Sequence, residues 1–282
     1  MARAVLQAAL ADLADVPATS RWVRSGAVRL HALDYGSGSG SGGGVSLVML
    51  PGITSPAITM DFVARELTDL VRPIVLDVRG RGLSDAGPSY ALDDYAADVL
   101  AVLRGLELDR PLLLGHSMGA RIAAAAAAGG ADLRGTVLVD PPMSGPGRAP
   151  YPTTLAAFLG QLAEAARGTD ADEVARSWPR WPRREQELRA RWLSSCDTDA
   201  VAATHAGFES EDFFDAWPKV PAPTVLLHGA DSPVVTAAGV AEARAVNPAA
   251  RFVSIPDAGH MVFWDNPATA LMLVREALAT LI

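Results

Sequence analysis

Residues 112–121 read Leu-Leu-Leu-Gly-His-Ser-Met-Gly-Ala-Arg, and they carry the most specific structural signal in the chain. The three leucines are typical of a buried parallel strand, and the alanine-rich run 120–128 is typical of a tightly packed helix. Between them Gly115, Ser117 and Gly119 form a G-x-S-x-G motif. Glycine lets neighbouring backbone segments approach closely, so we predict a strand, a sharp turn and a helix that hold the serine in a strained position.

Ser117 is the candidate nucleophile of this turn, because the amino end of the following helix favours negative charge at its hydroxyl. A serine hydroxyl is inert near neutral pH without a base. Among the five histidines we favour His260, which follows the last predicted strand in the sequence Pro-Asp-Ala-Gly-His. His116 belongs to the turn and is expected to pack locally. The other three are interpreted as core or solvated residues: His31, His205 and His228.

An acyl-transfer site also needs two backbone N–H groups that point at one oxyanion. The residue after the nucleophile, Met118, is predicted to supply one of them. The other is predicted at Ile53, in the loop 50–56 that follows the strand-like run 45–50.

The carboxylate that would orient His260 has two candidates. Asp140 ends the predicted strand 136–140, and Asp231 follows the predicted strand 224–228. Both fit the chain order Ser…Asp…His, and both lie at the carboxyl ends of strands. Chain order therefore leaves the choice open.

Strand-like and helix-like stretches alternate along most of the chain, which indicates an α/β fold with a mostly parallel sheet flanked by helices. The interval 143–217 breaks this alternation, because it holds only helical and Trp/Arg-rich sequence. We therefore predict a core of residues 1–142 and 218–282 and an inserted helical cap at 143–217, above the carboxyl ends of the strands. The predicted strands are 28–35, 45–50, 74–77, 112–115, 136–140, 224–228 and 252–255, and the predicted helices are 57–70, 92–108, 118–129, 236–246 and 268–281.

Three smaller features complete the map. The apolar residues of 2–14 recur at helical spacing and predict a short amphipathic helix packed on the body. The glycine-rich stretch 36–44 is interpreted as an overlong hairpin loop between two strands. The aromatic residues of the cap either line a pocket or form the core of the cap itself; they are Phe158, Trp178, Trp181 and Trp192.

The composition of the chain argues against several classes of binding partner. The chain has 282 residues and a formal net charge of −8, which argues against non-specific binding of nucleic acid. It has neither a Lys/Arg run nor an apolar stretch long enough for a membrane. Cys196 is the only cysteine and no paired-histidine spacing occurs, so we expect no metal and no other cofactor. We expect a cytoplasmic protein that acts on a small molecule; its oligomeric state stays open.

The motifs together resemble those of the α/β-hydrolase superfamily over nearly the whole chain. The resemblance rests on the G-x-S-x-G turn, on Asp-Val-Arg-Gly-Arg-Gly-Leu-Ser at 77–84 and on 256–260. Within the superfamily, residues 50–59, 115–121, 137–148 and 258–261 are similar to the N-formylmaleamate deformylases of nicotinate degradation and to the related acetamidomethylene-succinate hydrolases of pyridoxine breakdown. This implies a serine hydrolase that cleaves a small carboxylate-bearing amide through an acyl-enzyme.

The resemblance also indicates which carboxylate would orient His260. Most superfamily members carry it three residues after a glycine that follows the penultimate strand, and that slot here holds Ser232. The two amide-cleaving groups instead take the acid from the end of the preceding strand, which implies Asp140. Because their substrates are carboxylates, an arginine in or near the cap should bind that group. The resemblance does not say which one, and the candidates are Arg148, Arg176 and Arg180.

Alternative functions remain on the same residues. A carboxylesterase or a carbon–carbon bond hydrolase would use the same triad, and a non-catalytic receptor for a small ligand could use the same fold. Haloalkane and epoxide chemistry is disfavoured, because those enzymes carry aspartate where Ser117 stands. Asp77, Arg79 and Arg81 are expected to order the loop after their strand, and Arg121 is expected to be a buried structural residue.

Overall fold

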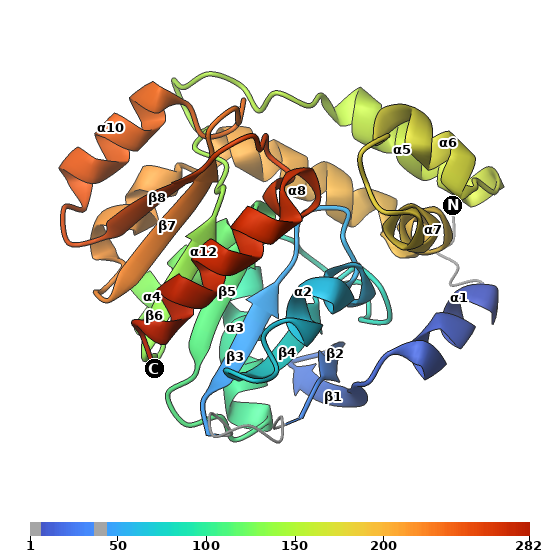
Figure 1. Ribbon diagram of the computed structural model, residues 1–282, viewed down its shortest axis with the longest axis horizontal. Helices are drawn as coiled ribbons and strands as arrows, with labels where there is room; N and C mark the ends of the chain where they lie inside the picture. The colour runs from blue at the N-terminus through green and yellow to red at the C-terminus, as the bar shows by residue number, and fades with distance from the viewer. Residues whose placement is uncertain (1–6, 37–43) are drawn as a thin grey trace.

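The computed structural model describes residues 7–36 and 44–282, and its centre is an eight-stranded sheet (Figure 1). The strand order is β1-β2-β4-β3-β5-β6-β7-β8. Six neighbouring strands are parallel to one another: β4, β3, β5, β6, β7 and β8. In contrast, β2 is antiparallel to both of its neighbours. The strands are β1 (Thr19–Ser25), β2 (Val28–Asp34), β3 (Ser46–Leu50), β4 (Arg72–Asp77), β5 (Leu112–His116), β6 (Gly135–Val139), β7 (Thr224–Gly229) and β8 (Arg251–Ile255).

Two apolar clusters sandwich the sheet. Alternate side chains of one strand point to opposite faces, so Leu113 lies in one cluster while Leu112 and Leu114 lie in the other. The first cluster packs under α3 (Leu92–Gly105), α4 (Met118–Ala128) and α10 (Ala237–Val246), and the second under α2 (Asp61–Arg65) and α12 (Pro267–Ala279). The predicted α/β class with a mostly parallel, helix-flanked sheet is confirmed.

Two details at the amino-terminal edge differ from expectation. The hairpin predicted around 36–44 is wrong, because β4 lies between β2 and β3 in the sheet; residues 37–43 themselves lie outside the described part. β1, which the sequence did not predict, instead forms the hairpin with β2. Most of its residues are exposed, as on an edge strand, so it lacks the apolar signal of a buried strand.

Other predicted helices shift in detail. The helix predicted over 57–70 is a 3₁₀ turn, η2 (Ala57–Met60), followed by the short α2. At the amino terminus, α1 (Gln7–Asp12) leads into η1 (Leu13–Asp15), and Leu10 is 45% exposed instead of packed. Asp12 attaches this segment to the body by accepting hydrogen bonds from Arg191 and Trp192. The amino-terminal segment is therefore held against the body partly by hydrogen bonds, and not only by the apolar contacts that the pattern predicts.

The chain between β6 and β7, which contains the predicted cap, is helical. We call residues 143–217 the cap segment. It holds α5 (Leu155–Arg167), α6 (Ala171–Ser177), α7 (Arg183–Trp192), η3 (Leu193–Ser195), α8 (Thr198–Ser210) and α9 (Phe213–Ala216), and η4 (Trp217–Lys219) leads back to β7. Figure 1 shows α5, α6 and α7 beyond one end of the sheet. No helix in the described ranges is long and apolar enough to cross a bilayer.

Candidate active site

Ser117 sits on the sharp turn between β5 and α4. Its backbone angles are φ 57° and ψ −122°, a conformation that L-residues rarely adopt. The flanking glycines make this turn possible, since a Cβ at Gly115 would collide with the backbone of Gly119, and a Cβ at Gly119 would collide with the carbonyl of Leu50. The turn presents the Ser117 side chain at the floor of a pocket.

Ser117, His260 and Asp140 form one hydrogen-bonded series. The Ser117 Oγ lies 2.8 Å from His260 Nε2, and His260 Nδ1 lies 2.6 Å from Asp140 Oδ2. His260 follows β8 and precedes α11 (Val262–Asp265). A nucleophile, a base and an orienting carboxylate in this order form the arrangement that serine hydrolases use.

Of the two candidate acids, the structure places Asp140 against His260. Asp140 is fully buried and also accepts hydrogen bonds from the Gly229 amide at 2.9 Å and from the Ser232 hydroxyl at 2.6 Å. The carboxylate is thus held in place by contacts with the backbone of β7, the Ser232 side chain and His260. Asp231 is exposed, and its backbone N–H donates to the Ala258 carbonyl.

His116 lies beneath the base and stacks on it, with 5.3 Å between the ring centroids. Burial, and then the nearby charge of His260, lower the pKa of His116 to about 4. The ring is therefore neutral at neutral pH, and its Nε2–H donates to the His260 carbonyl at 2.9 Å. His116 supports the loop that carries the base, in line with the local role expected from the sequence.

The predicted oxyanion donors lie next to the nucleophile. Met118 is the first residue of α4, and a Cβ added at Gly52 would lie 3.5 Å from the Ser117 Cβ, so the loop of Ile53 abuts the turn. Within the described residues neither the Ile53 nor the Met118 amide donates to another protein group. Both N–H groups are thus available to an oxygen bound at Ser117.

The loop that follows β4 holds the Ile53 loop in place. Arg81 is fully buried, and its Nε donates to the Ile53 carbonyl at 3.0 Å. The same guanidinium bonds to the hydroxyls of Tyr95 and Thr204, and so reaches α3 and α8. Asp77 accepts from the Ala57 amide at 2.6 Å. These residues order more than their own loop, because they also hold the backbone of Ile53, the predicted oxyanion donor.

The pocket has a volume of about 440 Å³ and is enclosed by the turn, the 52–55 loop, the cap segment and the 259–265 stretch. Three of the four aromatic residues singled out in the cap line it: Phe158, Trp178 and Trp181. Trp178 stacks on Trp181, which stacks on Trp264 of α11, so the rings join the cap segment to the core. Trp192 lies apart from the pocket and is buried against α1.

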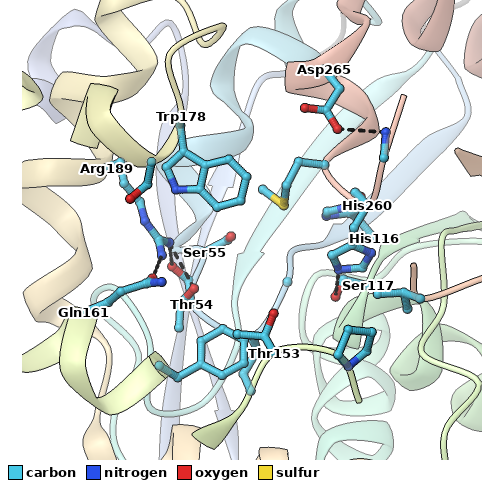
Figure 2. A pocket seen from close by; sticks show the side chains of 18 of the residues that line it. Thr54, Ser55, His116, Ser117, Thr153, Gln161, Trp178, Arg189, His260 and Asp265 are labelled. Carbon is cyan, nitrogen blue, oxygen red and sulfur yellow. Dashed lines mark hydrogen bonds between the residues drawn. The ribbon is translucent and has the colours of Figure 1, made fainter. Parts of the chain in front are cut away.

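Arg189 of α7 lies in the pocket wall across from Ser117 and His260 (Figure 2). Its side chain is buried and donates to the Thr54 carbonyl and hydroxyl and to the Gln161 amide oxygen. Among the described residues no carboxylate pairs with it, and burial lowers its pKa. A buried cation without a counter-ion is unfavourable unless an anion joins it, so this wall can bind an anionic ligand.

The arginines named from the sequence are placed differently. Arg148 pairs with Asp212 and Glu242, and Arg176 is exposed away from the pocket. Arg180 reaches the pocket but is 68% exposed and lies 3.5 Å from Asp265. The sequence does not single out Arg189. Its burial in the pocket wall, with no paired carboxylate among the described residues, is visible only in three dimensions. Arg121 is buried and bonds to backbone carbonyls, as expected.

Tyr151 is a second residue that the sequence did not single out. Its hydroxyl lies 3.2 Å from His260 Nε2, inside the pocket.

For metals, no group of three or more His, Cys, Asp or Glu side chains suited to an ion occurs in residues 7–36 and 44–282.

Comparison with known proteins identifies the class. The model of the alpha/beta hydrolase family matches residues 47–271, most of the chain. The protein therefore belongs to the alpha/beta hydrolase family, which confirms the resemblance drawn from its motifs.

Particular relatives narrow the comparison. The chain is 41% identical to an N-formylmaleamate deformylase of Pseudomonas putida, over 86% of this chain and 90% of that protein. It is 30% identical to a 2-(acetamidomethylene)succinate hydrolase of Mesorhizobium japonicum, over 94% and 97%. A crystal structure of the N-formylmaleamic acid deformylase of Pseudomonas putida S16, in a serine-to-alanine variant, superposes with a TM-score of 0.85 at 35% identity and covers 91% of this chain and all of that one.

Proposed function

We propose that this hydrolase cleaves a small amide that carries a carboxylate, and that its substrate is N-formylmaleamate, which it splits into formate and maleamate. The observation that carries the substrate class is Arg189, a buried cation in the wall opposite Ser117 that pairs with no carboxylate in the described part of the chain. The identity with the deformylase of Pseudomonas putida supports the particular amide. A carboxylate bound at Arg189 would direct the other end of a short substrate toward the nucleophile.

The first half of the reaction makes an acyl-enzyme. His260 removes the proton of Ser117 as the serine oxygen attacks the formyl carbon, and Asp140 stabilises the imidazolium that forms. The amides of Ile53 and Met118 stabilise the oxyanion. His260 then protonates the leaving nitrogen, the C–N bond breaks, and maleamate departs.

The second half releases the acid. His260 removes a proton from water, which attacks the formyl ester on Ser117. The tetrahedral intermediate collapses, Ser117 regains its proton from His260, and formate leaves. The reaction consumes one water and needs no redox partner. A carboxylesterase or a carbon–carbon bond hydrolase would use the same steps, but a buried cation at Arg189 favours substrates with an anionic end.

The test gives purified protein N-formylmaleamate and measures formate and maleamate by mass spectrometry. We expect equal amounts of the two products, and none with Ser117→Ala. If aryl esters are cleaved but N-formylmaleamate is not, the substrate assignment is wrong. Binding of the compound without turnover would favour the receptor alternative.

The same assay tests Arg189 with a second substrate, the cis isomer of N-formylcrotonamide, in which a methyl group replaces the carboxylate and the double bond keeps its geometry. Hydrogen bonds to charged groups contribute about 1.5–3 kcal/mol, so Arg189→Met should lower kcat/KM for N-formylmaleamate by about tenfold to a hundredfold. It should change the value for N-formylcrotonamide by less than about threefold, because that substrate offers no anion. Arg180→Met is the matched control and should leave both values near wild type. An equal loss on both substrates would mean that Arg189 only supports the Thr54 loop.

A further inference from the structure

Tyr151 occupies the approach to the base from the cap side. It lies in the chain between β6 and α5 and is 6% exposed. Its ring centroid is 4.8 Å from that of Phe208 and 6.2 Å from that of Phe158, and it meets His205 edge to face. This packing holds the ring, so its hydroxyl has a fixed direction toward His260.

The hydroxyl has few partners. Within residues 7–36 and 44–282 it contacts only the Ser117–His260 pair, at 3.2 Å from His260 Nε2. His260 Nδ1 faces the Asp140 carboxylate and donates to it, so the neutral ring offers one lone pair at Nε2. The hydroxyls of Ser117, at 2.8 Å, and Tyr151 both face that single lone pair.

Catalysis removes this acceptor. When His260 takes the proton of Ser117, Nε2 becomes a donor and the Ser117 oxygen bonds to the acyl carbon, so Tyr151 loses its acceptor in this pair. A buried hydroxyl without an acceptor loses about 1–3 kcal/mol. Burial also raises the pKa of the Tyr151 phenol, so it stays a donor at neutral pH. The leaving group must then lie beside Nε2, because Nε2–H protonates it. It is therefore the acceptor within reach of Tyr151.

We propose that Tyr151 is a catalytic residue whose hydroxyl donates a hydrogen bond to the leaving group as the scissile bond breaks. The bond goes to an oxygen of the leaving group, either the ester oxygen or the carbonyl oxygen conjugated with a departing amide nitrogen, because the lone pair of that nitrogen receives the proton of His260. No proton is transferred from the phenol. Because this interaction replaces the one with His260 only after the proton moves, it stabilises the transition state more than bound substrate. The inference rests on the proposed hydrolase mechanism, but not on N-formylmaleamate as the substrate.

The test is a series of aryl formates from p-nitrophenyl to phenyl, with kcat/KM measured for wild type, Tyr151→Phe and Tyr90→Phe. This constant reports acylation, the step that expels the leaving group. A nitrophenolate needs little help, so Tyr151→Phe should lower its kcat/KM by less than about threefold, whereas phenyl formate should lose about tenfold to a hundredfold. Tyr90 is the matched control, since its hydroxyl bonds to the Gly87 amide and Asp197 outside the pocket.

The outcomes separate the alternatives. An equal loss along the whole series would overturn the proposal, because Tyr151 would then position His260. No loss at any ester, or no ester turnover by wild type, would overturn it as well. Normal turnover of p-nitrophenyl formate by Tyr151→Phe shows that the variant is folded. A wild type that cleaves the esters but not N-formylmaleamate would contradict the proposed substrate alone.

Discussion

The position of Asp140 shows how one carboxylate can reach a base from either of two strands. β6 and β7 are parallel neighbours, and the Asp140 amide donates to the Leu227 carbonyl at 2.8 Å. The end of β6 therefore lies beside the turn after β7, where Ser232 stands. Ser232 donates to Asp140 instead of providing an acid itself. The end of β6 and the turn after β7, which are the two positions where the acid can stand, are therefore neighbours in the structure.

A paired substitution tests this residue. Asp140→Asn should lower kcat by about 10³- to 10⁴-fold, because the base loses the partner that fixes its tautomer and stabilises its charge. Asp231→Asn should stay within about threefold of wild type, since Asp231 is exposed and outside the pocket. The measurement is kcat on the substrate that the wild type turns over. A large loss in Asp231→Asn beside a near-normal Asp140→Asn would reverse the assignment.

Among the elements, two neighbouring loops act as one unit. Residues 50–56 after β3, which carry the predicted oxyanion donor Ile53 and are here called the oxyanion loop, are held by Asp77 at the end of β4 and by Arg81 in the loop that follows it. Arg81 is also bonded to Thr204 of α8. Arg81 therefore links the backbone of Ile53, the predicted oxyanion donor, to an element of the cap segment.

Arg81→Lys tests this coupling. Lysine keeps the charge but lacks the fork that reaches Ile53, Tyr95 and Thr204 together. Removing one oxyanion donor lowers kcat by about 10²- to 10³-fold. A displaced donor should therefore lower it by about tenfold to a hundredfold, with little change in KM. Arg79→Lys is the control: Arg79 pairs with Asp98 and does not touch the oxyanion loop, so we expect reduced thermal stability at near-normal kcat. Equal kcat in both variants would argue against the coupling.

At the scale of the whole molecule, buried polar groups link the active site to stability. His116 is held neutral in the folded protein, with a pKa of about 4 against an ordinary value of 6.5. The unfolded chain binds this proton more tightly, so folding is disfavoured as the pH falls from about 6.5 to 4. A shift of this size corresponds to about 3 kcal/mol across that window.

Urea unfolding of wild type and His116→Gln at neutral pH and at about pH 4.5 measures this contribution. Glutamine has no titratable group, so the loss of stability between the two pH values should be smaller in the variant by about 2–3 kcal/mol. An identical loss in both proteins would mean that His116 does not titrate in this range. The difference between the proteins is the readout, because carboxylates contribute equally to both.

Local features could be predicted from the order of residues along the chain. The sharp turn at Ser117 is encoded within ten residues, because its strand, its two glycines and the start of its helix are adjacent in the chain. The alternation of buried strands and amphipathic helices likewise indicated the α/β class. His260 could be chosen from its place after the last strand, and the family resemblance pointed to Asp140.

Other features depend on contacts between residues that are distant in the chain. That β4 separates β2 from β3 depends on which strand edges pair in space, and chain adjacency does not report it. Arg189 stands out because it is buried, lies in the pocket wall and, among the described residues, has no paired carboxylate, which is a property of a three-dimensional neighbourhood. Tyr151 stands out because packing directs its hydroxyl at His260. Charge compensation and hydrogen-bond direction arise between residues far apart in the chain, so the pattern along the chain does not contain them.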